Sequence, residues 1–358
     1  MKKNILFFTR TMGLGGTENV VLQLCDIMVD KYNVIVCSSG GVNVEKLKYM
    51  GIKHYTIPDI EDKSLSNFID IFIKLNKIFK KEKIDIIHTH HRMASFYTFL
   101  LNKIYNFKFF VTVHNTFLDK RILTKLSYTG ANIVAVGEQV KSNLCDFYKI
   151  DSNKVTVIKN AVKPFEGEIK EVEIISRYKR QGNYIVGNIG RLSEQKGMKY
   201  FIEAIPIVLD RIHNVKFFII GDGEEKEMLQ SVIKRNGLEE SVILLGYRKD
   251  VQNIMMQLDL IVLSSLWEGL PLTPIEAFSV KKTVVATAVD GTIEIVKNNQ
   301  NGVTVNSKDS IALGNSIIKL LENSELRESY EKNAFKTYEE EFSFEALINN
   351  YRCFYEEN

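Results

Sequence analysis

Short apolar runs alternate with helical repeats of apolar residues along almost the whole chain. In the first part, the runs predict strands at 5–8, 34–37, 84–88, 109–113, 133–136 and 155–158, with helices at 17–28 and 67–80. A second series predicts strands at 184–189, 216–220, 242–245, 260–263, 283–287 and 302–305, with helices at 199–210, 224–236, 275–278, 310–322 and 324–339. Strands that alternate with helices predict parallel sheets, whose ligands bind beyond the carboxyl ends of the strands.

The alternation predicts an α/β protein with two Rossmann-like, doubly wound parallel-sheet domains, which agrees with a length of 358 residues. We expect a first domain at 1–165 and a second domain at 183–340. Between them, residues 166–182 are charge-rich, show no clear period and are predicted to be the linker. Residues 341–358 have the apolar spacing of an amphipathic helix. A ligand site is expected in a cleft between the two domains.

Charge divides the chain into two unlike parts. Residues 1–165 contain 24 Lys and Arg against 14 Asp and Glu, a net charge of +10, whereas the remainder contains 23 against 30, a net charge of −7. The two parts should therefore meet different partners. A basic cluster on and after the second predicted helix would suit an anionic membrane surface, although a merely solvated face fits it equally well. The cluster consists of Lys74, Lys77, Lys80, Lys81 and Lys83.

Targeting signals and cysteine spacing bear on the compartment. The four cysteines form no paired motif, and neither a secretory leader nor a long apolar segment is visible. These features predict a cytoplasmic protein, with peripheral contact at the inner face of the plasma membrane as the membrane hypothesis.

The stretch 258–278 combines a buried strand, a turn at Gly269 and Pro271, and a helix start at Pro274. Such an arrangement points free backbone N–H groups at an anion. Glu268 and Glu276 flank the turn, and a carboxylate would repel a phosphate but accept hydrogen bonds from sugar hydroxyls. The stretch thus predicts a nucleotide-sugar site, although a plain loop followed by a helix with a favourable N-terminal Glu fits it as well.

A Gly-rich loop follows the first strand of each predicted domain. Residues 13–18 form neither a Walker A motif nor a dinucleotide fingerprint, so ATP binding and an NAD dehydrogenase are disfavoured. The physical use of such a loop is close approach of backbone amides to a phosphate. In the loop 190–197, Arg191 and Lys196 suit a diphosphate. A simple tight turn and a solvated loop are the respective alternatives.

Histidines gather in the first domain. His88, His90 and His91 lie close together in sequence, but no carboxylate or cysteine stands at ligand spacing, so we expect no metal site. His114 ends a predicted strand and should face the cleft. No D-x-D motif is present, so the charges of Arg191 and Lys196 would replace a metal ion in stabilising a leaving diphosphate.

Together these segments resemble glycosyltransferase family 4, also described as glycosyl transferases of group 1, over nearly the whole chain. Glu268 and Glu276 match the family's E-x7-E motif, residues 13–18 its Gly-rich first loop, and residues 190–197 its G-R-x4-K-G segment. Segments 85–90, 111–115, 221–223, 245–248 and 290–294 follow the family order. Two segments depart from the family: 280–283 lacks the usual Gly-Pro, and 160–162 reads Asn-Ala-Val instead of Asn-Gly-Val.

The resemblance implies the GT-B fold and a retaining transferase without metal or cofactor. Arg191 and Lys196 would hold the donor diphosphate, Glu276 would accept from the ribose, and Glu268 would contact the donor hexose. Further donor contacts would come from Gly15, Gly16, Gly246, Arg248, Gly269, Leu270, Leu272 and Thr273. His114 would lie beside the transferred sugar, with catalytic roles for His114, Glu268, Arg191 and Lys196. The acceptor side would include Glu18, His90, His91 and His114, and the C-terminal helix would pack back on the first domain.

The expected reaction moves a hexose or an N-acetylhexosamine from a nucleotide-diphosphate sugar, expected to be UDP-linked. The acceptor would be a glycan or a polyprenyl-diphosphate-linked glycan in bacterial surface polysaccharide biosynthesis, and nucleic acid is not an expected partner. Two alternatives stay open: a GT-B-fold nucleotide-sugar 2-epimerase, which would isomerise the donor alone, and a non-catalytic homologue that binds the nucleotide sugar.

Overall fold

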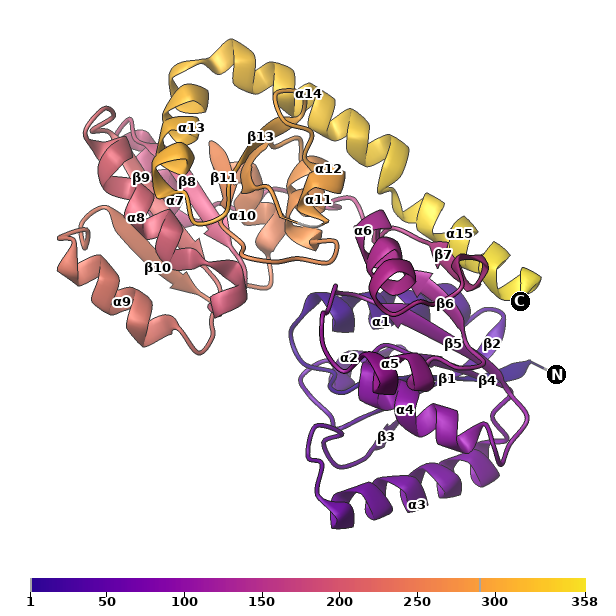
Figure 1. Cartoon of the computed structure of the whole chain (residues 1–358). Coiled ribbons are helices and arrows are strands. Elements are labelled where there is room, and N and C mark those ends of the chain that lie inside the picture. Colours follow the sequence, from indigo (N-terminus) through magenta and orange to yellow (C-terminus); the bar gives the residue numbers. More distant parts are fainter. Residues whose placement is uncertain (1, 290) are drawn as a thin grey trace. The chain divides into compact units, whose positions relative to one another are not determined.

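The computed structural model describes residues 2–289 and 291–358 and divides into two compact units (Figure 1). Unit 1 comprises Met1–Lys159 with Ile348–Asn358, and unit 2 comprises Asn160–Leu347. Each unit contains one sheet whose paired strands are all parallel. The predicted α/β class with two parallel sheets is thereby confirmed.

Within the described residues, unit 1 holds a seven-stranded sheet in the order β3-β2-β1-β4-β5-β6-β7. The strands are β1 (Lys3–Phe8), β2 (Tyr32–Ser38), β3 (Lys53–Thr56), β4 (Ile86–Thr89), β5 (Lys108–Val113), β6 (Asn132–Ala135) and β7 (Val155–Val157). Ile5 of β1 pairs with Val34 on one side and with Ile86 on the other. The strand order reverses between β1 and β4, and such a reversal is where doubly wound sheets bind ligands.

Helices cover both faces of this sheet. Those of unit 1 are α1 (Gly16–Met28), α2 (Val44–Tyr49), α3 (Leu65–Glu82), α4 (Arg92–Leu101), α5 (Arg121–Ser127), α6 (Glu138–Ser142) and the end of α15 (Phe344–Glu357). The Ser64 hydroxyl caps α3 by accepting from the Asn67 backbone N–H. The end of α15 belongs to unit 1 because Tyr355 hydrogen-bonds His88 and packs its ring on Phe110.

In the described part of unit 2, a six-stranded sheet has the order β10-β9-β8-β11-β12-β13. The strands are β8 (Tyr184–Ile189), β9 (Val215–Ile220), β10 (Val242–Gly246), β11 (Leu260–Leu263), β12 (Val284–Thr287) and β13 (Gly302–Val305). β8 lies between β9 and β11, so the order reverses at the β8–β11 pair, and the loops after these two strands lie at the same edge.

The helices of unit 2 bury apolar faces against this sheet. They are α7 (Glu173–Arg180), α8 (Met198–Leu209), α9 (Lys226–Arg235), α10 (Val251–Gln257), α11 (Leu272–Ser279), α12 (Thr292–Ile295), α13 (Ser310–Glu322) and α14 (Ser324–Glu341). Phe201 of α8 meets Phe217 of β9 edge-on at 5.9 Å between ring centroids, and both side chains are fully buried.

Some elements depart from the predictions. Within the predicted linker 166–182, where the sequence showed no clear period and no helix was predicted, Glu173–Arg180 forms α7 and buries Ile175. The strand β3 was not predicted because its four residues are half-buried or exposed and show no apolar run. Helices α2, α4, α5, α6, α10 and α12 were also missed; most of them are too short to show a full helical repeat.

None of the helices in the described part of the chain combines the length and the hydropathy that a membrane-spanning helix requires.

Candidate functional site

The carboxyl ends of β8 and β11 in unit 2 bring two predicted site residues into direct contact. Glu268 is 5% exposed, and its Oε1 atom accepts from Lys196 Nζ at 2.5 Å and from Ser265 Oγ at 2.7 Å. Its Oε2 atom accepts from Gln195 Nε2 at 3.3 Å. A buried carboxylate is costly unless such donors surround it, so the Glu268 carboxylate is held in one orientation.

Further hydrogen bonds join the loop after β8 to the loop after β11. The Leu266 backbone N–H donates to the Gln195 carbonyl at 2.7 Å, and Gln195 Nε2 donates to the Trp267 carbonyl at 3.0 Å. The Ser264 hydroxyl donates to the Lys196 carbonyl at 3.0 Å. The two loops therefore form one preorganised surface, although about 70 residues separate them in sequence.

Gly197 is required for this junction. Its φ of 53° lies in the left-handed region, and a Cβ atom built there would lie 2.3 Å from the Ser264 carbonyl oxygen. Glycine adopts this conformation without strain, and only a residue without a Cβ atom allows this approach without a clash.

Glu276 lies one turn into α11, after Pro271 and Pro274. Burial raises the pKa of its carboxyl to about 7, and the Lys196 ammonium opposes that rise. No residue within 2–289 or 291–358 donates a hydrogen bond to the Glu276 carboxylate. Lys196 thus acts electrostatically on both glutamates, and the Glu276 carboxylate still needs a donor that a ligand hydroxyl could supply.

The two predicted arginines pair with other partners. Arg191 Nη2 lies 3.1 Å from Glu224 Oε2, and these side chains are 68% and 58% exposed. Arg248 pairs with Asp250 at 2.7 Å, and this hydrogen bond lowers the pKa of the Asp250 carboxyl to about 2. Neither arginine belongs to the Lys196–Glu268 network, so donor contacts by their side chains would use the N–H groups that are not engaged with Glu224 or Asp250.

Several predicted backbone contacts lie at this edge of unit 2. Leu272 and Thr273 are in the first turn of α11, where a helix leaves N–H groups without intrahelical acceptors. The preceding Leu270 is 4% exposed, and its carbonyl accepts from Asn160 Nδ2 at 3.0 Å, which holds the turn after Gly269. Gly246 ends β10, which β9 separates from β8 in the sheet. The position of these backbone groups is compatible with binding a diphosphate, and this role stays a prediction.

The carboxylate of Glu18 lies against the Gly-rich loop of unit 1. Glu18 Oε1 accepts from Thr11 Oγ1 at 2.5 Å, and a Cβ atom added to Gly15 would lie 2.5 Å from Glu18 Oε2. A phosphate that approached the amides of Gly15 and Gly16 would meet this negative charge. The predicted phosphate contact therefore requires the Glu18 side chain to turn away.

Two predicted acceptor-side histidines lie together in unit 1. His90 Nδ1 and His114 Nε2 are 3.1 Å apart, and the rings of His88 and His90 stack with 4.5 Å between centroids. Burial lowers the pKa of His114 to about 4, so its ring is neutral at pH 7. A neutral imidazole can exchange hydrogen bonds with a sugar hydroxyl but supplies no positive charge for a phosphate.

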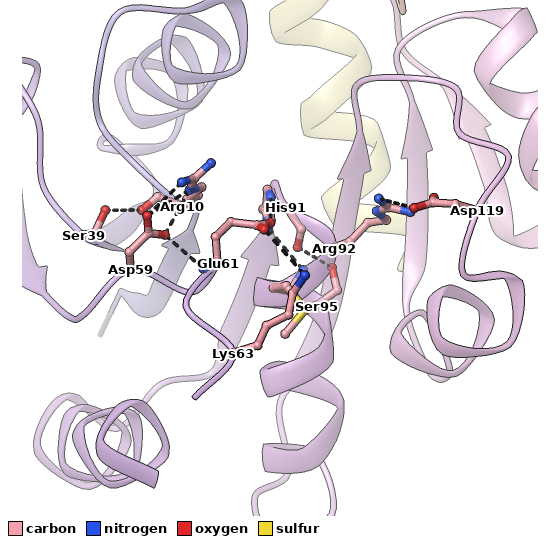
Figure 2. Close-up of polar contacts among 10 residues, drawn as sticks. Arg10, Ser39, Asp59, Glu61, Lys63, His91, Arg92, Ser95 and Asp119 are labelled. Carbon is pink, nitrogen blue, oxygen red and sulfur yellow. Dashed lines mark hydrogen bonds and ion pairs between the residues drawn. The ribbon is translucent and has the colours of Figure 1, made fainter. Parts of the chain in front are cut away.

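His91 belongs to a neighbouring set of polar contacts, shown in Figure 2. Its Nδ1 atom accepts from the Met93 backbone N–H at 3.2 Å, which leaves Nε2 protonated to donate to Glu61 Oε1 at 3.3 Å. Beside it, Arg10 forms a two-pronged pair with Asp59, with Nε–Oδ1 at 3.0 Å and Nη2–Oδ2 at 2.8 Å.

Arg92 completes this set by pairing with Asp119 at 2.5 Å while its guanidinium lies 4.1 Å from the centroid of the Phe117 ring. We call these residues the unit 1 edge cluster. It comprises Arg10, Asp59, Glu61, His91, Arg92 and Asp119. Guanidinium donors beside carboxylate acceptors form a surface that sugar hydroxyls can bridge.

Sequence reasoning found only His91 among the cluster. Arg10 and Arg92 stand just after β1 and β4, so the rule that ligands bind beyond strand ends could have identified them. Asp59 and Glu61 follow β3, and they were missed because that strand was not predicted.

No group of three or more His, Cys, Asp or Glu side chains within the described residues is arranged to hold a metal ion. Of the family-like segment 290–294, residue Asp290 lies outside the described residues.

Comparisons with known proteins cover most of the chain. Residues 14–164 match the family described as Glycosyltransferase Family 4, and residues 170–337 match the family described as Glycosyl transferases group 1. The UDP-Gal:alpha-D-GlcNAc-diphosphoundecaprenol alpha-1,3-galactosyltransferase of Escherichia coli is 28% identical over 343 residues, which are 87% of this chain and 86% of the relative. The capsular polysaccharide biosynthesis glycosyltransferase CapM of Staphylococcus aureus is 25% identical over 355 residues, or 91% of each chain.

Among solved structures, the Anabaena protein HepE in complex with UDP-glucose superposes with a TM-score of 0.86 at 21% identity. The superposition covers 99% of this chain and 100% of HepE, so the two chains share one fold.

Proposed function

The chain belongs to glycosyltransferase family 4 and has the GT-B fold, and from this premise we propose that it is a retaining hexosyltransferase. The donor is a nucleotide-diphosphate hexose or N-acetylhexosamine, with UDP as the nucleotide. The acceptor is a glycan or a lipid-linked glycan in surface polysaccharide biosynthesis. Support for UDP comes from HepE, which was solved with UDP-glucose, and from the E. coli relative, whose name specifies UDP-Gal.

One observation carries the proposal: Lys196 lies between two glutamates that have different environments. The Glu268 carboxylate accepts from three protein side chains, whereas the Glu276 carboxylate accepts no hydrogen bond from the described residues. A Lys ammonium has three donors, so Lys196 can keep its bond to Glu268 and still donate to a diphosphate oxygen. The free Glu276 carboxylate would accept from the nucleotide's ribose.

In the proposed transfer, the bond between the sugar C1 and the diphosphate oxygen breaks while the acceptor hydroxyl attacks C1 on the same face. The acceptor proton passes to an oxygen of the departing diphosphate, so no separate protein base is needed. Charge develops on that diphosphate, and a fixed cation such as Lys196 stabilises it more in the transition state than in the bound donor. We propose that this charge, with Arg191, makes a metal ion unnecessary.

The test is a nucleotide-release assay with a panel of UDP-, GDP- and ADP-sugars, run with and without EDTA. The proposal expects UDP release from one UDP-sugar, retained in EDTA and stimulated by a glycan acceptor. Lys196→Met should lower kcat at least about a hundredfold, in line with the loss of one oxyanion-stabilising donor. The matched control is Lys234→Met, an exposed lysine on α9, which should leave kcat unchanged.

Other outcomes would identify the alternatives. Isomerisation of the UDP-sugar without any acceptor would point to an epimerase. Nucleotide binding without turnover of any sugar, with any acceptor tried, would point to a binding protein.

A further inference from the structure

Helices α3, α4 and α5 lie side by side in unit 1 (Figure 1). Phe68 of α3 stacks on Tyr97 of α4 with 5.3 Å between ring centroids, and the Tyr105 hydroxyl just after α4 donates to Asn76 Oδ1 at 3.0 Å. These contacts join the inner sides of α3 and α4, so the other sides of these helices are not used in this packing.

The outer side of α3 exposes three large apolar residues in a row. Leu65, Ile69 and Ile73 are 75%, 49% and 46% exposed, and their spacing of four residues places them on one stripe of the helix. The buried side of the same helix is formed by Ile71, Leu75, Ile78 and Phe79, so α3 is already anchored to its unit. Packing of α3 against its unit therefore does not require the exposed stripe.

Apolar exposure continues across the neighbouring helices. Ile104, just after α4, is 57% exposed. Leu118, in the loop before α5, and Ile122, in its first turn, are 77% and 86% exposed. We call this set of exposed apolar residues the apolar face. It comprises Leu65, Ile69, Ile73, Ile104, Leu118 and Ile122. Single exposed apolar residues are ordinary, but several on adjacent helices mark an interaction surface.

The segment that carries the apolar face is rich in positive charge. Residues 65–127 contain 11 Lys and Arg against four Asp and Glu, a net charge of +7. Lys77 and Lys81 extend the stripe of α3 at the same four-residue spacing. Three of the acidic residues are engaged within the protein: Asp70 with Lys74, Glu82 with Lys53 and Tyr55, and Asp119 with Arg92.

We propose that the apolar face docks on an anionic lipid bilayer, with α3 lying in the plane of the membrane surface. An apolar stripe flanked by lysines is the pattern of an interfacial helix, because the apolar side chains enter the acyl boundary while the lysines meet lipid phosphates. The charge complementarity selects this occupant: a second copy of the chain would bring the same positive charge against itself.

The position of the apolar face deepens the proposed function by placing the acceptor on a membrane lipid. The amino-terminal ends of α3, α4 and α5 follow the carboxyl ends of β3, β4 and β5, so Leu65 and Ile122 lie at the edge of the sheet that also carries the unit 1 edge cluster. A lipid held in the bilayer could present its head group at that cluster. This step rests on the proposed function, whereas membrane docking itself does not require transfer activity.

The experiment is vesicle flotation of the full chain, with phosphatidylcholine vesicles that either contain or lack phosphatidylglycerol. Wild-type protein should float with the anionic vesicles at low salt and only weakly with neutral ones. Ile69→Ser/Ile73→Ser and Lys77→Glu/Lys80→Glu should each weaken the partition coefficient by about tenfold or more. All four positions bear side chains outside the core, and thermal melting will verify that each variant folds.

Matched controls change unit 2 instead. Ile311, which is 66% exposed on α13, becomes serine in one control, and Lys234 and Arg235 on α9 become glutamate in the other, with the same change in net charge. Both controls should float like the wild type.

Three results would overturn the docking proposal. The first is wild-type protein that stays unbound to anionic vesicles at low salt, and the second is equal loss of flotation in variants and controls. The third is a wild-type dimer in light scattering that Ile69→Ser/Ile73→Ser dissociates, which would assign the face to a second copy. UDP release with a soluble acceptor is measured in parallel. Variants that lose flotation but keep this activity would show that docking and catalysis are separate. Wild-type protein that floats but is inactive would refute only the proposed function.

Discussion

The pH dependence of donor binding offers a direct test of Glu276. Because burial raises the pKa of this carboxyl to about 7, the group is mostly protonated just below neutral pH in the free protein. A ribose hydroxyl donates to the ionised carboxylate more strongly than to the neutral acid. Donor binding should therefore require, or drive, loss of this proton.

The expected magnitude follows from the pKa. With a value of about 7, roughly one carboxyl in eleven is ionised at about pH 6 and roughly ten in eleven at about pH 8, so the affinity for UDP-glucose should rise about tenfold between them. UDP-glucose is the better probe because its diphosphate is esterified at both ends and lacks the titrating terminal phosphate of UDP. Glu276→Gln cannot ionise, so its affinity should be weak and flat over this range.

The protein contains its own optical probe for the assay. Trp267 is the single tryptophan of the sequence, is 42% exposed and precedes Glu268, so its fluorescence should report donor binding. Titrations would be run at each pH with wild type, Glu276→Gln and the exposed-site control Glu240→Gln. Equal pH dependence in wild type and Glu276→Gln would refute the assigned role of this carboxyl.

Stability without ligand provides an independent test of the same shift. A carboxyl whose pKa is higher in the folded state binds its proton more tightly there, so its contribution to stability is full below about pH 4.5 and is lost as pH rises through about 7. Glu276→Gln should consequently raise the melting temperature at about pH 8 relative to wild type, and the gain should shrink at about pH 5. A stability difference that is independent of pH would contradict the raised pKa.

Three further predictions concern the packing around the sites. Ser265→Ala removes one donor from the buried Glu268 carboxylate and should cost about 1–3 kcal/mol of unfolding free energy in urea titrations; no measurable loss would mean that the carboxylate is not held as described. Gly197→Ala should lower the unfolding free energy by more than about 1 kcal/mol in the same assay, because φ at Gly197 is positive and the added methyl would lie 2.3 Å from the Ser264 carbonyl oxygen. An unchanged unfolding free energy would contradict this conformation. Tyr355→Phe removes the hydroxyl that contacts the buried His88 and should cost about 1–3 kcal/mol; unchanged thermal melting would argue against docking of the end of α15 in unit 1.

Many strands and helices of the fold could be predicted from local sequence patterns. The predicted strands 184–189, 260–263 and 302–305 and the helix 310–322 have the observed bounds, because continuous buried runs and complete helical repeats are visible over a few residues. The family-like segments likewise predicted Glu268, Glu276 and Lys196 as site residues, and in the structure Lys196 pairs with Glu268 and acts electrostatically on Glu276. Secondary structure and motif residues that depend on the spacing of nearby residues could therefore be predicted without the tertiary structure.

Pairing between distant residues was decided only by the tertiary structure. Spacing alone treated Arg191 and Lys196 as equal phosphate ligands, but folding pairs Lys196 with Glu268 and Arg191 with Glu224. The same limit applies to α3, whose apolar residues predicted the helix without showing that Ile69 and Ile73 face outward. Sequence spacing specifies which side chains share a strand or a helix face, whereas burial and ion pairing depend on which surface the chain brings against them.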